Sequence, residues 1–369
     1  IMKLTLLQEN LNSALTTVSH FLPSRPTLPV LGNILLATEK NRLKISATNL
    51  EMGINYFVGA KIENEGKTTV LARPFLEFVN SLPAGKVDLF LKKEGLEAAC
   101  GGFQALFPVM PAEEFPQIST ISSSKISFKT AVLNEAIKET VFAATSDESR
   151  PVLGGVQFKI KGKECQLAAT DGYRLSLKKI SLTSSLEEQT FILPASALAE
   201  VGRVKIEKEE MEMGLSDKEK QAVFFLPNIE LSSRLLEGSF PNVEEVIPKE
   251  GKTKVVLEKE DFRRAIKMAA IFARESANIV KIGIGENELV ISANSPQVGE
   301  TKSRLEAQVA GPKQKIAFNF RFLLDLVEAG EGERLVMELN DSLSPALFYF
   351  PKDNTFSHVI MPVRLQEEE

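Results

Sequence analysis

The sequence has few of the residues that metal sites, disulfides and membrane spans require. Its only two histidines, His20 and His358, are far apart in the chain, so a histidine-rich zinc site is not expected. The two cysteines, Cys100 and Cys165, are interpreted as buried, reduced thiols of a cytosolic protein. No apolar run approaches the roughly 18–20 residues that span a bilayer, and no secretory signal opens the sequence. These absences predict a cytoplasmic protein without a membrane partner.

Sequence motifs of nucleotide-binding proteins and hydrolases are missing as well. No G-x-x-x-x-G-K-[ST] or G-x-S-x-G pattern occurs. Gly283-Ile284-Gly285 resembles the start of a dinucleotide fingerprint, but the third glycine is not in place and a hairpin is favoured. A carboxylate metal site from Asp147, Glu148 and Asp171 is an alternative to a turn and a solvated acidic loop, which we favour. We therefore expect no catalytic residue, cofactor or metal, and a protein that is not an enzyme.

Charge and composition leave a binding protein as the main class. The net charge of −5 argues against indiscriminate adhesion to nucleic acid, although it does not exclude a local basic surface. A hydrophobic content of 43% is that of an ordinary globular protein with sizeable cores. The length of 369 residues leaves room for two or three domains.

One strand-and-turn pattern occurs three times. It reads Ile45-Ser46-Ala47-Thr48-Asn49, then Leu167-Ala168-Ala169-Thr170-Asp171, then Ile291-Ser292-Ala293-Asn294-Ser295. The copies are about 120 residues apart, which is the size of a small domain and not of a solenoid repeat. A domain present three times, without a catalytic pattern, favours a function based on shape.

Each copy also predicts an amphipathic helix and a second, shorter one. The apolar residues recur with helical spacing and are Leu11, Ala14, Leu15 and Val18; Leu133, Ala136 and Ile137, with Thr140 in the fourth position; and Phe262, Ala265, Ile266 and Ala269. In the first copy the helices are expected at residues 6–22 and 74–82. Hairpin turns are expected at Gly66-Lys67 and at residues 161–164, with linkers near residues 119–125 and 249–254. The predicted fold class is α+β, with helices on one face of antiparallel sheet.

Two features do not fit a purely structural role. Tyr173-Arg174 follows the Asp171-Gly172 turn and offers an aromatic face and a guanidinium, both of which are enriched at binding hot spots. Residues 358–365 stay apolar almost to the end of the sequence, where chains are usually polar. A plain turn and a docked terminal strand remain the alternatives to a binding site.

These motifs together resemble the bacterial DNA sliding clamps, the beta subunits of DNA polymerase III. The resemblance rests on Arg25-Pro26-Thr27-Leu28-Pro29-Val30-Leu31-Gly32-Asn33, on the run Ala169-Thr170-Asp171-Gly172-Tyr173-Arg174-Leu175, and on the terminal Met361-Pro362-Val363-Arg364-Leu365. It covers residues 2–365 and implies three domains of the clamp fold, at 2–122, 123–250 and 251–365. Head-to-tail dimers of such chains close a ring with helices lining the hole and sheets outside. The family members are processivity factors for DNA replication.

The resemblance also implies two sets of binding residues. Contacts to double-stranded DNA are expected from Arg25, Arg73, Lys138, Arg150, Arg263, Arg264, Lys267, Arg274 and Arg321, each of which could also be an ordinary solvated cation. A pocket for linear peptide motifs is implied at Leu153, Thr170, Gly172, Tyr173, Arg174, Leu175, Pro241, Val246, Asn319, Phe322, Leu343, Val359, Ile360, Met361, Pro362, Val363 and Arg364. Departures from the family at Glu245, Ala277 and Pro345 suggest a different motif preference, and the predicted helix at residues 195–201 lacks a basic residue.

Partners follow from the same resemblance. They are the alpha subunit of DNA polymerase III, the clamp loader and other proteins with a clamp-binding motif, together with a second copy of the chain through Phe103, Phe107, Ile271 and Phe272. A DNA-independent repeat scaffold that binds short peptides is the alternative function, and it would need no cationic helix faces.

Overall fold

The computed structural model describes residues 2–118, 125–204, 208–216, 220–249 and 251–364. The expected domain limits at residues 122, 250 and 365, and most of the polar stretch at 119–125, lie outside the described residues. The chain folds as two compact units. The first unit is Ile1–Thr130 with Arg203–Leu235, and the second is Ala131–Gly202 with Leu236–Glu369. The middle repeat therefore contributes to both units.

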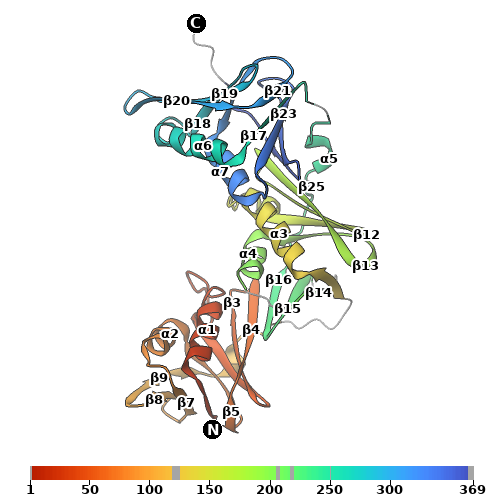
Figure 1. Cartoon of the computed structure of the whole chain (residues 1–369). Helices are drawn as coiled ribbons and strands as arrows, with labels where there is room; N and C mark the ends of the chain where they lie inside the picture. The colour runs from red at the N-terminus through yellow and green to blue at the C-terminus, as the bar shows by residue number, and fades with distance from the viewer. Residues whose placement is uncertain (1, 119–124, 205–207, 217–219, 250, 365–369) are drawn as a thin grey trace. The chain divides into compact units, whose positions relative to one another are not determined.

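The first unit consists of two antiparallel sheets and two helices (Figure 1). Its helices are α1 (Gln8–Ser19) and α2 (Ala72–Ser81), with 3-10 turns at Pro29–Gly32 and Ala112–Glu114. Its strands are β1 (Lys3–Leu7), β2 (Asn33–Glu39), β3 (Arg42–Thr48), β4 (Met52–Gly59), β5 (Lys61–Asn64), β6 (Lys67–Leu71), β7 (Lys86–Leu91), β8 (Leu96–Cys100), β9 (Phe103–Phe107), β10 (Val109–Met110), β11 (Lys125–Lys129), β14 (Glu210–Ser216), β15 (Gln221–Leu226) and β16 (Ile229–Arg234). The sheet orders are β5-β1-β7-β8-β9 and β10-β6-β2-β3-β4-β16-β15-β14-β11.

The second unit repeats this arrangement with more helices. They are α3 (Thr130–Thr140), α4 (Ala195–Arg203), α5 (Val243–Val246), α6 (Lys259–Ala273) and α7 (Phe320–Ala329), with 3-10 turns at Val141–Ala143 and Pro151–Gly154. The strands are β12 (Gly155–Thr170), β13 (Arg174–Pro194), β17 (Thr253–Glu258), β18 (Ile279–Ile284), β19 (Glu288–Ser295), β20 (Gly299–Glu306), β21 (Gln308–Ala310), β22 (Gln314–Asn319), β23 (Arg334–Leu339), β24 (Ala346–Phe350) and β25 (Asp353–Ile360). The sheet orders are β12-β13-β25-β24-β23-β17-β21 and β20-β19-β18-β22.

The predicted apolar stripes are confirmed in all three copies. Every residue named for the stripes of α1, α3 and α6 is buried. Thr140, in the polar fourth position of α3, is also buried and donates its hydroxyl hydrogen to the backbone oxygen of Ala136 at 2.6 Å. The pairs α1 with α2 and α6 with α7 lie side by side (Figure 1). Each helix therefore presents one stripe to a core and its other side to solvent.

The two hairpin predictions in the first and second copies are wrong. Gly66-Lys67 separates β5 from β6, but these strands belong to different sheets and do not pair. Residues 161–164 lie inside the continuous strand β12, where Gly162 has a φ of +63° and the register to β13 shifts. A glycine in this conformation accommodates a bulge, so the strand continues. Gly283-Ile284-Gly285 does lead into a hairpin, because β18 pairs with β19.

Helix bounds in the middle copy also differ from expectation. The helix predicted at residues 195–201 extends to Arg203, so α4 ends with a basic side chain in its last turn. A cation in this position interacts favourably with the carbonyl end of a helix.

Both cysteines are buried free thiols, as predicted, and burial raises the pKa of Cys165 to about 12. Among the described helices, none has the length and apolar character to cross a membrane.

Candidate functional site

The turn between β12 and β13 presents Tyr173 to solvent. Asp171 accepts two backbone N–H bonds through Oδ1, from Tyr173 at 2.8 Å and from Arg174 at 3.0 Å. Thr170 closes the other side by accepting from the N–H of Gly172 at 3.0 Å. Gly172 has a φ of +92°, which a residue with a side chain rarely adopts. The turn is thus rigidly built, and it leaves 61% of Tyr173 exposed.

Arg174 lies beneath this turn and is used internally. Its guanidinium bonds Asp171 at 3.1 Å, Asp325 of α7 at 2.5 Å and the backbone oxygen of Phe142 at 2.7 Å. It is also stacked over the rings of Phe322 and Phe142, at 4.5 and 5.4 Å from their centroids. Its side chain is only 9% exposed. Arg174 therefore positions the turn and is not a free donor for a ligand.

The end of the chain forms a wall next to the turn. Strand β25 pairs with β13, and beyond it the N–H of Met361 donates to the oxygen of Tyr173 at 2.8 Å. The N–H of Val363 then donates to the oxygen of Ala317 on β22, also at 2.8 Å. Met361 and Val363 are consequently held to the Tyr173 turn and to β22, and Met361 keeps 39% of its surface exposed.

The residues predicted for a peptide pocket all lie in the second unit, but they differ in exposure. Tyr173, Leu343, Val246 and Met361 are the exposed large apolar side chains. Leu175, Val359 and Ile360 are buried; Leu175 and Val359 pack with Ala168, Leu177 and Val243 in a small cluster under the surface. Asn319 caps α7 by accepting from the N–H of Arg321 at 3.0 Å. Within this set, the side chains available to a ligand are therefore those of Tyr173, Val246, Leu343 and Met361, whereas Leu175, Val359 and Ile360 belong to the buried interior.

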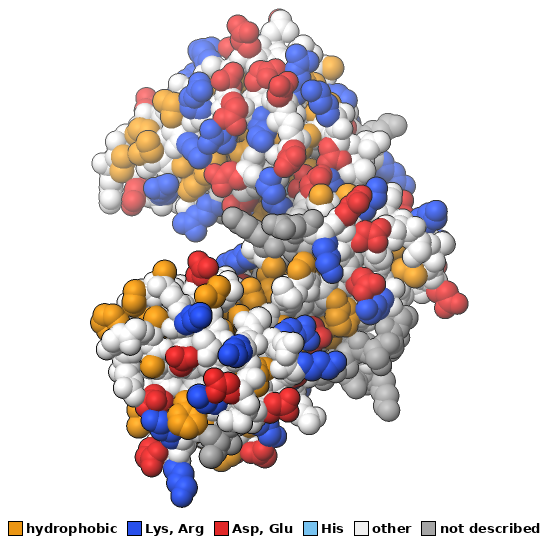
Figure 2. Space-filling model, turned by 60° about the horizontal axis from the view of Figure 1, so that its bottom comes forward, with side chains coloured by type: hydrophobic (Ala, Val, Ile, Leu, Met, Phe, Trp, Pro, Cys, Tyr) orange, Lys and Arg blue, Asp and Glu red, His pale blue; other side chains and the backbone are white. Residues whose placement is uncertain are grey.

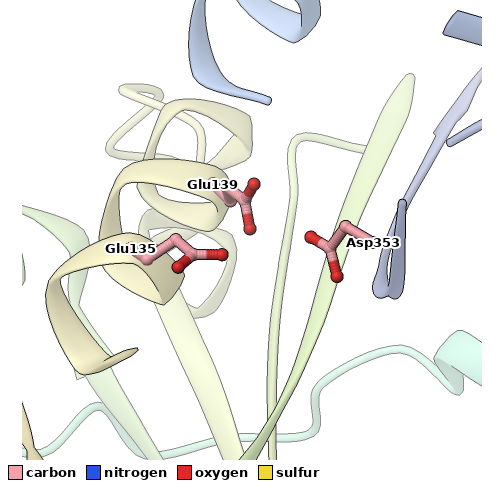
Figure 3. A group of neighbouring side chains, drawn as sticks. All are labelled: Glu135, Glu139 and Asp353. Atoms are coloured by element: carbon pink, nitrogen blue, oxygen red, sulfur yellow. The ribbon is translucent and has the colours of Figure 1, made fainter. Parts of the chain in front are cut away.

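A second charged cluster lies farther along β13. Figure 3 shows the carboxylates of Glu135, Glu139 and Asp353 converging, the first two from helix α3. The ammonium of Lys178 lies 2.6 Å from Glu135, 2.7 Å from Glu139 and 2.7 Å from Asp353. This is the group of carboxylates within the described residues that is close enough to hold a metal, and the chain's own lysine fills it. Asp147 and Asp171, which we considered as metal ligands in the sequence, instead accept backbone N–H bonds within turns.

Burial changes the protonation of this cluster. Glu139 has no exposed surface, and burial raises its pKa to about 7 against the opposing effect of Lys178. Burial alone would lower the pKa of Lys178, but its bonds to the three carboxylates raise it above the ordinary value. Asp353 is also desolvated, yet its bonds to Lys178 and Thr355 hold its pKa below the ordinary value. Lys178 therefore stays charged while Glu139 titrates near neutrality.

We predict that replacing Glu139 with glutamine changes how stability depends on pH. A carboxyl whose folded pKa is raised stabilises the fold fully below its unfolded pKa of 4.5 and loses that contribution as pH rises through about 7. Glutamine does not titrate. The free energy of unfolding of Glu139→Gln, taken relative to that of the unchanged protein, should therefore rise by about 1–3 kcal/mol between about pH 5 and pH 8. Urea unfolding at several pH values measures this. The matched control Glu244→Gln, in an exposed pair with Lys159, should show no such trend, and an equal trend in both variants would contradict the assignment.

The cations expected to face DNA fall into two groups. Arg25, Arg73, Arg274 and Arg321 are exposed, and within the described part of the chain they have no ion pair. The other five have acidic partners: Lys138 with Glu331, Arg150 with Asp147, Arg263 with Glu260, Arg264 with Asp261, and Lys267 with Glu328. Arg150 also donates to the backbone oxygen of Asp171 at 2.8 Å, so it braces the Tyr173 turn. Positive and negative side chains are interspersed on the face that Figure 2 shows.

The residues expected at a dimer interface belong to or adjoin two sheet edges. Phe103 is 59% exposed and lies on β9, the edge of its sheet. Ile271 is 58% exposed near the end of α6, which packs against the edge strand β20. Phe107 instead packs against Phe75 and Phe78, with ring centroids 5.3 and 5.5 Å away, and Phe272 packs against its domain core. Phe103 and Ile271 are therefore the two free apolar groups of this set.

Sequence reasoning missed the residues that support the Tyr173 turn. Asp325 and Phe142 hold Arg174, yet they are 151 and 32 positions away in the chain. His358 is buried with its ring 5.3 Å from that of Phe142 and Nδ1 2.6 Å from the hydroxyl oxygen of Ser176, and burial lowers its pKa to about 3. The polar alternation Arg174, Ser176 and Lys178 on a buried strand was the available signal, because buried polar side chains need partners.

Comparisons with known proteins agree along the chain. Family models match as "DNA polymerase III beta subunit, N-terminal domain" at residues 2–119, "central domain" at 127–242 and "C-terminal domain" at 244–364. The chain is 30% identical to the beta sliding clamp of Bacillus subtilis over 98% of this chain and 100% of that protein. It is 29% identical to the beta sliding clamp of a Synechocystis species, over 99% and 100%.

Solved structures give the same result. The crystal structure of the DNA polymerase sliding clamp from Bacillus subtilis superposes with a TM-score of 0.94 at 27% identity, covering 99% of this chain and 100% of that one. The DNA polymerase III beta subunit from Thermotoga maritima gives a TM-score of 0.92 at 28% identity, with the same coverage.

Proposed function

The chain belongs to the family of DNA polymerase III beta subunits, and from this premise we propose how its surfaces serve that role. As a beta sliding clamp it is a processivity factor that encircles DNA and binds polymerases through a motif-binding pocket. It is a non-catalytic subunit in DNA replication. The match of three successive domain models over nearly the whole chain carries this conclusion and sets aside the DNA-independent scaffold. Its site of action in our proposal is the cytoplasm.

We propose that three domains, at residues 2–122, 123–250 and 251–365, assemble with those of a second chain into a ring. Strand β9 of one copy and β20 of the other are both sheet edges with unpaired backbone groups, and Phe103 and Ile271 supply exposed apolar contacts beside them. A head-to-tail contact of this kind closes a ring when its rotation closes. The interface would thus be a sheet continued between chains and covered by apolar side chains.

DNA contact in this proposal comes from exposed cations on and near the helices. Four of them, Arg25, Arg73, Arg274 and Arg321, have no ion pair with any described residue and are available to phosphates directly. The five paired ones must exchange a carboxylate for a phosphate. Such contacts remain weak and salt-dependent. A ring retains DNA by enclosing it, so weak contacts are consistent with sliding.

Retention on circular DNA tests the proposal most directly. The purified protein, loaded with its clamp loader and ATP onto a nicked circular plasmid, should co-elute with the plasmid in gel filtration. Cutting the plasmid once should release it, because the ring slides off a free end. Equal retention on circular and linear DNA would mean direct adhesion and would overturn the ring. Failure of the protein to be retained on either form of DNA would also overturn it, provided that the same loader places a known beta clamp on the circular plasmid.

The exposed residues around the turn at residues 170–174 are proposed to bind the linear motifs of the polymerase alpha subunit, the clamp loader and other partners. Tyr173, Val246, Leu343 and Met361 offer apolar surface for a leucine or phenylalanine anchor, and burying one such anchor contributes roughly 1.5–3 kcal/mol. Loss of peptide freedom opposes this contribution. The expected affinity is near micromolar, about −8 kcal/mol, which allows partners to exchange.

We predict that Tyr173→Ala and Met361→Ala each weaken binding of a Gln-x-x-Leu-x-Phe peptide by about 1–2 kcal/mol, as truncated hot-spot contacts do. Fluorescence anisotropy with a labelled peptide measures the loss. Met268→Ala is the matched control, because Met268 is 50% exposed on another element. That variant should bind the peptide normally. Unchanged affinity in both test variants would place the motif elsewhere.

A further inference from the structure

A hollow of about 610 Å³ lies on the outward face of the sheet β20-β19-β18-β22, whose strands are labelled in Figure 1 except for β22. Side chains alternate along these strands. Ile282 and Ile316 are fully buried in the core, whereas their neighbours Lys281 and Lys315 are exposed on the other face. The hollow is thus on the side of the sheet opposite the core, in the second unit.

A missing side chain creates the hollow. On β18 the outward position after Lys281 is Gly283, which pairs with Val290 on one side and Lys315 on the other. A Cβ added at Gly283 would meet the Val290 Cβ at 3.9 Å, an ordinary contact, and Gly283 does not have a positive φ. The backbone therefore does not require glycine here. The lack of a side chain at Gly283 leaves an apolar floor, and a larger residue there would fill the hollow.

Three uncompensated ammonium groups surround this floor. Ser292 pairs across the sheet with both Lys281 and Lys302, so these two lysines flank Ser292. Lys315 lies opposite Gly283. Over the described residues, Lys281, Lys302 and Lys315 have no ion pair. Lys313, the fourth lysine at the hollow, already has an acidic partner in Glu286 at 2.8 Å, and Arg304, which pairs with Val290 across the sheet, bonds Glu288 at 3.2 Å. In a protein of net charge −5, this concentration of free positive charge marks an anion-binding surface.

The lining selects among anionic partners. None of the described residues that line the hollow is aromatic, so bases of a single strand would have no described ring to stack on. Its free cations are lysines, which act as point charges and lack the fork with which arginine grips a phosphate. An apolar patch ringed by lysines instead complements a peptide that carries an apolar side chain between carboxylates.

We propose that this hollow binds an acidic segment of a partner protein, with one apolar side chain on Gly283 and Val290 and carboxylates on Lys281, Lys302 and Lys315. It is separate from the motif surface around Tyr173. A partner could therefore hold the protein at two points, and the second contact would raise its effective affinity without competing for the first.

The test uses the full-length protein and a fluorescein-labelled peptide with the sequence Asp-Glu-Asp-Leu-Asp-Glu-Asp, at about 50 mM salt to limit screening. Saturable binding is expected. Lys281→Glu with Lys315→Glu should weaken it about tenfold or more, since two attractive charges become repulsive. Gly283→Ile, which keeps all the charges and suits a strand, should weaken it severalfold by filling the floor. The uncharged peptide with Asn and Gln should not bind.

Two controls separate this site from its alternatives. Lys40→Glu with Lys352→Glu changes the net charge equally, at exposed lysines in two turns, and should bind the peptide normally. An equal loss in that control would overturn the site in favour of general charge attraction. Tyr173→Ala should bind the motif peptide about 5- to 30-fold more weakly and keep its affinity for the acidic one, which distinguishes failure of this proposal from failure of the proposed function.

The remaining outcomes also support or overturn the proposal. The sequence ends in Glu367, Glu368 and Glu369, so a variant without residues 366–369 is titrated in parallel. Tighter peptide binding by that variant would support an acid-binding hollow for which the chain's own glutamates compete. Absence of binding by both forms would overturn the proposal. Preferential binding of an oligothymidine, lost in the same lysine variant, would assign the hollow to nucleic acid and overturn the peptide.

Discussion

Replacing both Phe103 and Ile271 with aspartate is expected to convert a dimer into a folded monomer. In the single chain the two side chains are 59% and 58% exposed, so the change should not disturb either unit. In the proposed dimer both would be buried, and an uncompensated buried charge costs about 3–5 kcal/mol. Two of them should raise the dissociation constant by at least about four orders of magnitude. Light scattering after gel filtration gives the mass directly.

The choice of these two residues comes from their exposure. Aspartate at Phe107 or Phe272 would damage the packing of a domain as well as the interface, because both side chains are partly buried against their own core. Leu28→Asp with Leu71→Asp is the matched control, since each leucine is 50% exposed on other elements. That variant should remain dimeric. A dimer of unchanged mass in the Phe103 and Ile271 variant would refute the interface.

Replacing Arg174 with alanine should both destabilise the second unit and abolish motif binding. The change leaves Asp171 and Asp325 without their shared cation and removes the stacking on Phe322 and Phe142. Breaking a buried ion pair costs about 3–5 kcal/mol, and the Tyr173 turn would lose one of its supports. Urea unfolding and peptide anisotropy are the two measurements.

The control is an arginine with the same kind of partner on the surface. Arg304 bonds Glu288 at 3.2 Å, but the two side chains are 63% and 45% exposed. Arg304→Ala should therefore cost no more than about 1 kcal/mol and leave motif binding unchanged. Similar losses in both variants would mean that burial does not decide the contribution of Arg174.

Local sequence patterns predicted the repeated helices well. The stripe Phe262, Ala265, Ile266 and Ala269 is buried because its spacing alone places it on one side of a helix. The turn at Asp171-Gly172 and the exposure of Tyr173 were also predictable, since the side chain of Asp171 and the free φ of Gly172 act within a few residues.

Long-range contacts account for what the sequence did not reveal. Whether Gly66-Lys67 joins two paired strands depends on which sheet each strand enters, and that depends on β1 and β2 elsewhere in the chain. Likewise, nothing near Lys178 in sequence indicates that Glu135, Glu139 and Asp353 surround it. Only the folded arrangement of α3, β13 and β25 brings these charges together.

The burial of both native cysteines makes the protein suited to site-specific labelling. Maleimide dyes react with the thiolate, and burial disfavours the thiolate of Cys165 while Cys100 is only 4% exposed. A thiol introduced at an exposed position such as Lys163 should therefore react alone, without removal of the native ones. Fluorophores attached in this way would let single-molecule energy transfer follow the opening and closing of the proposed ring in otherwise unaltered protein.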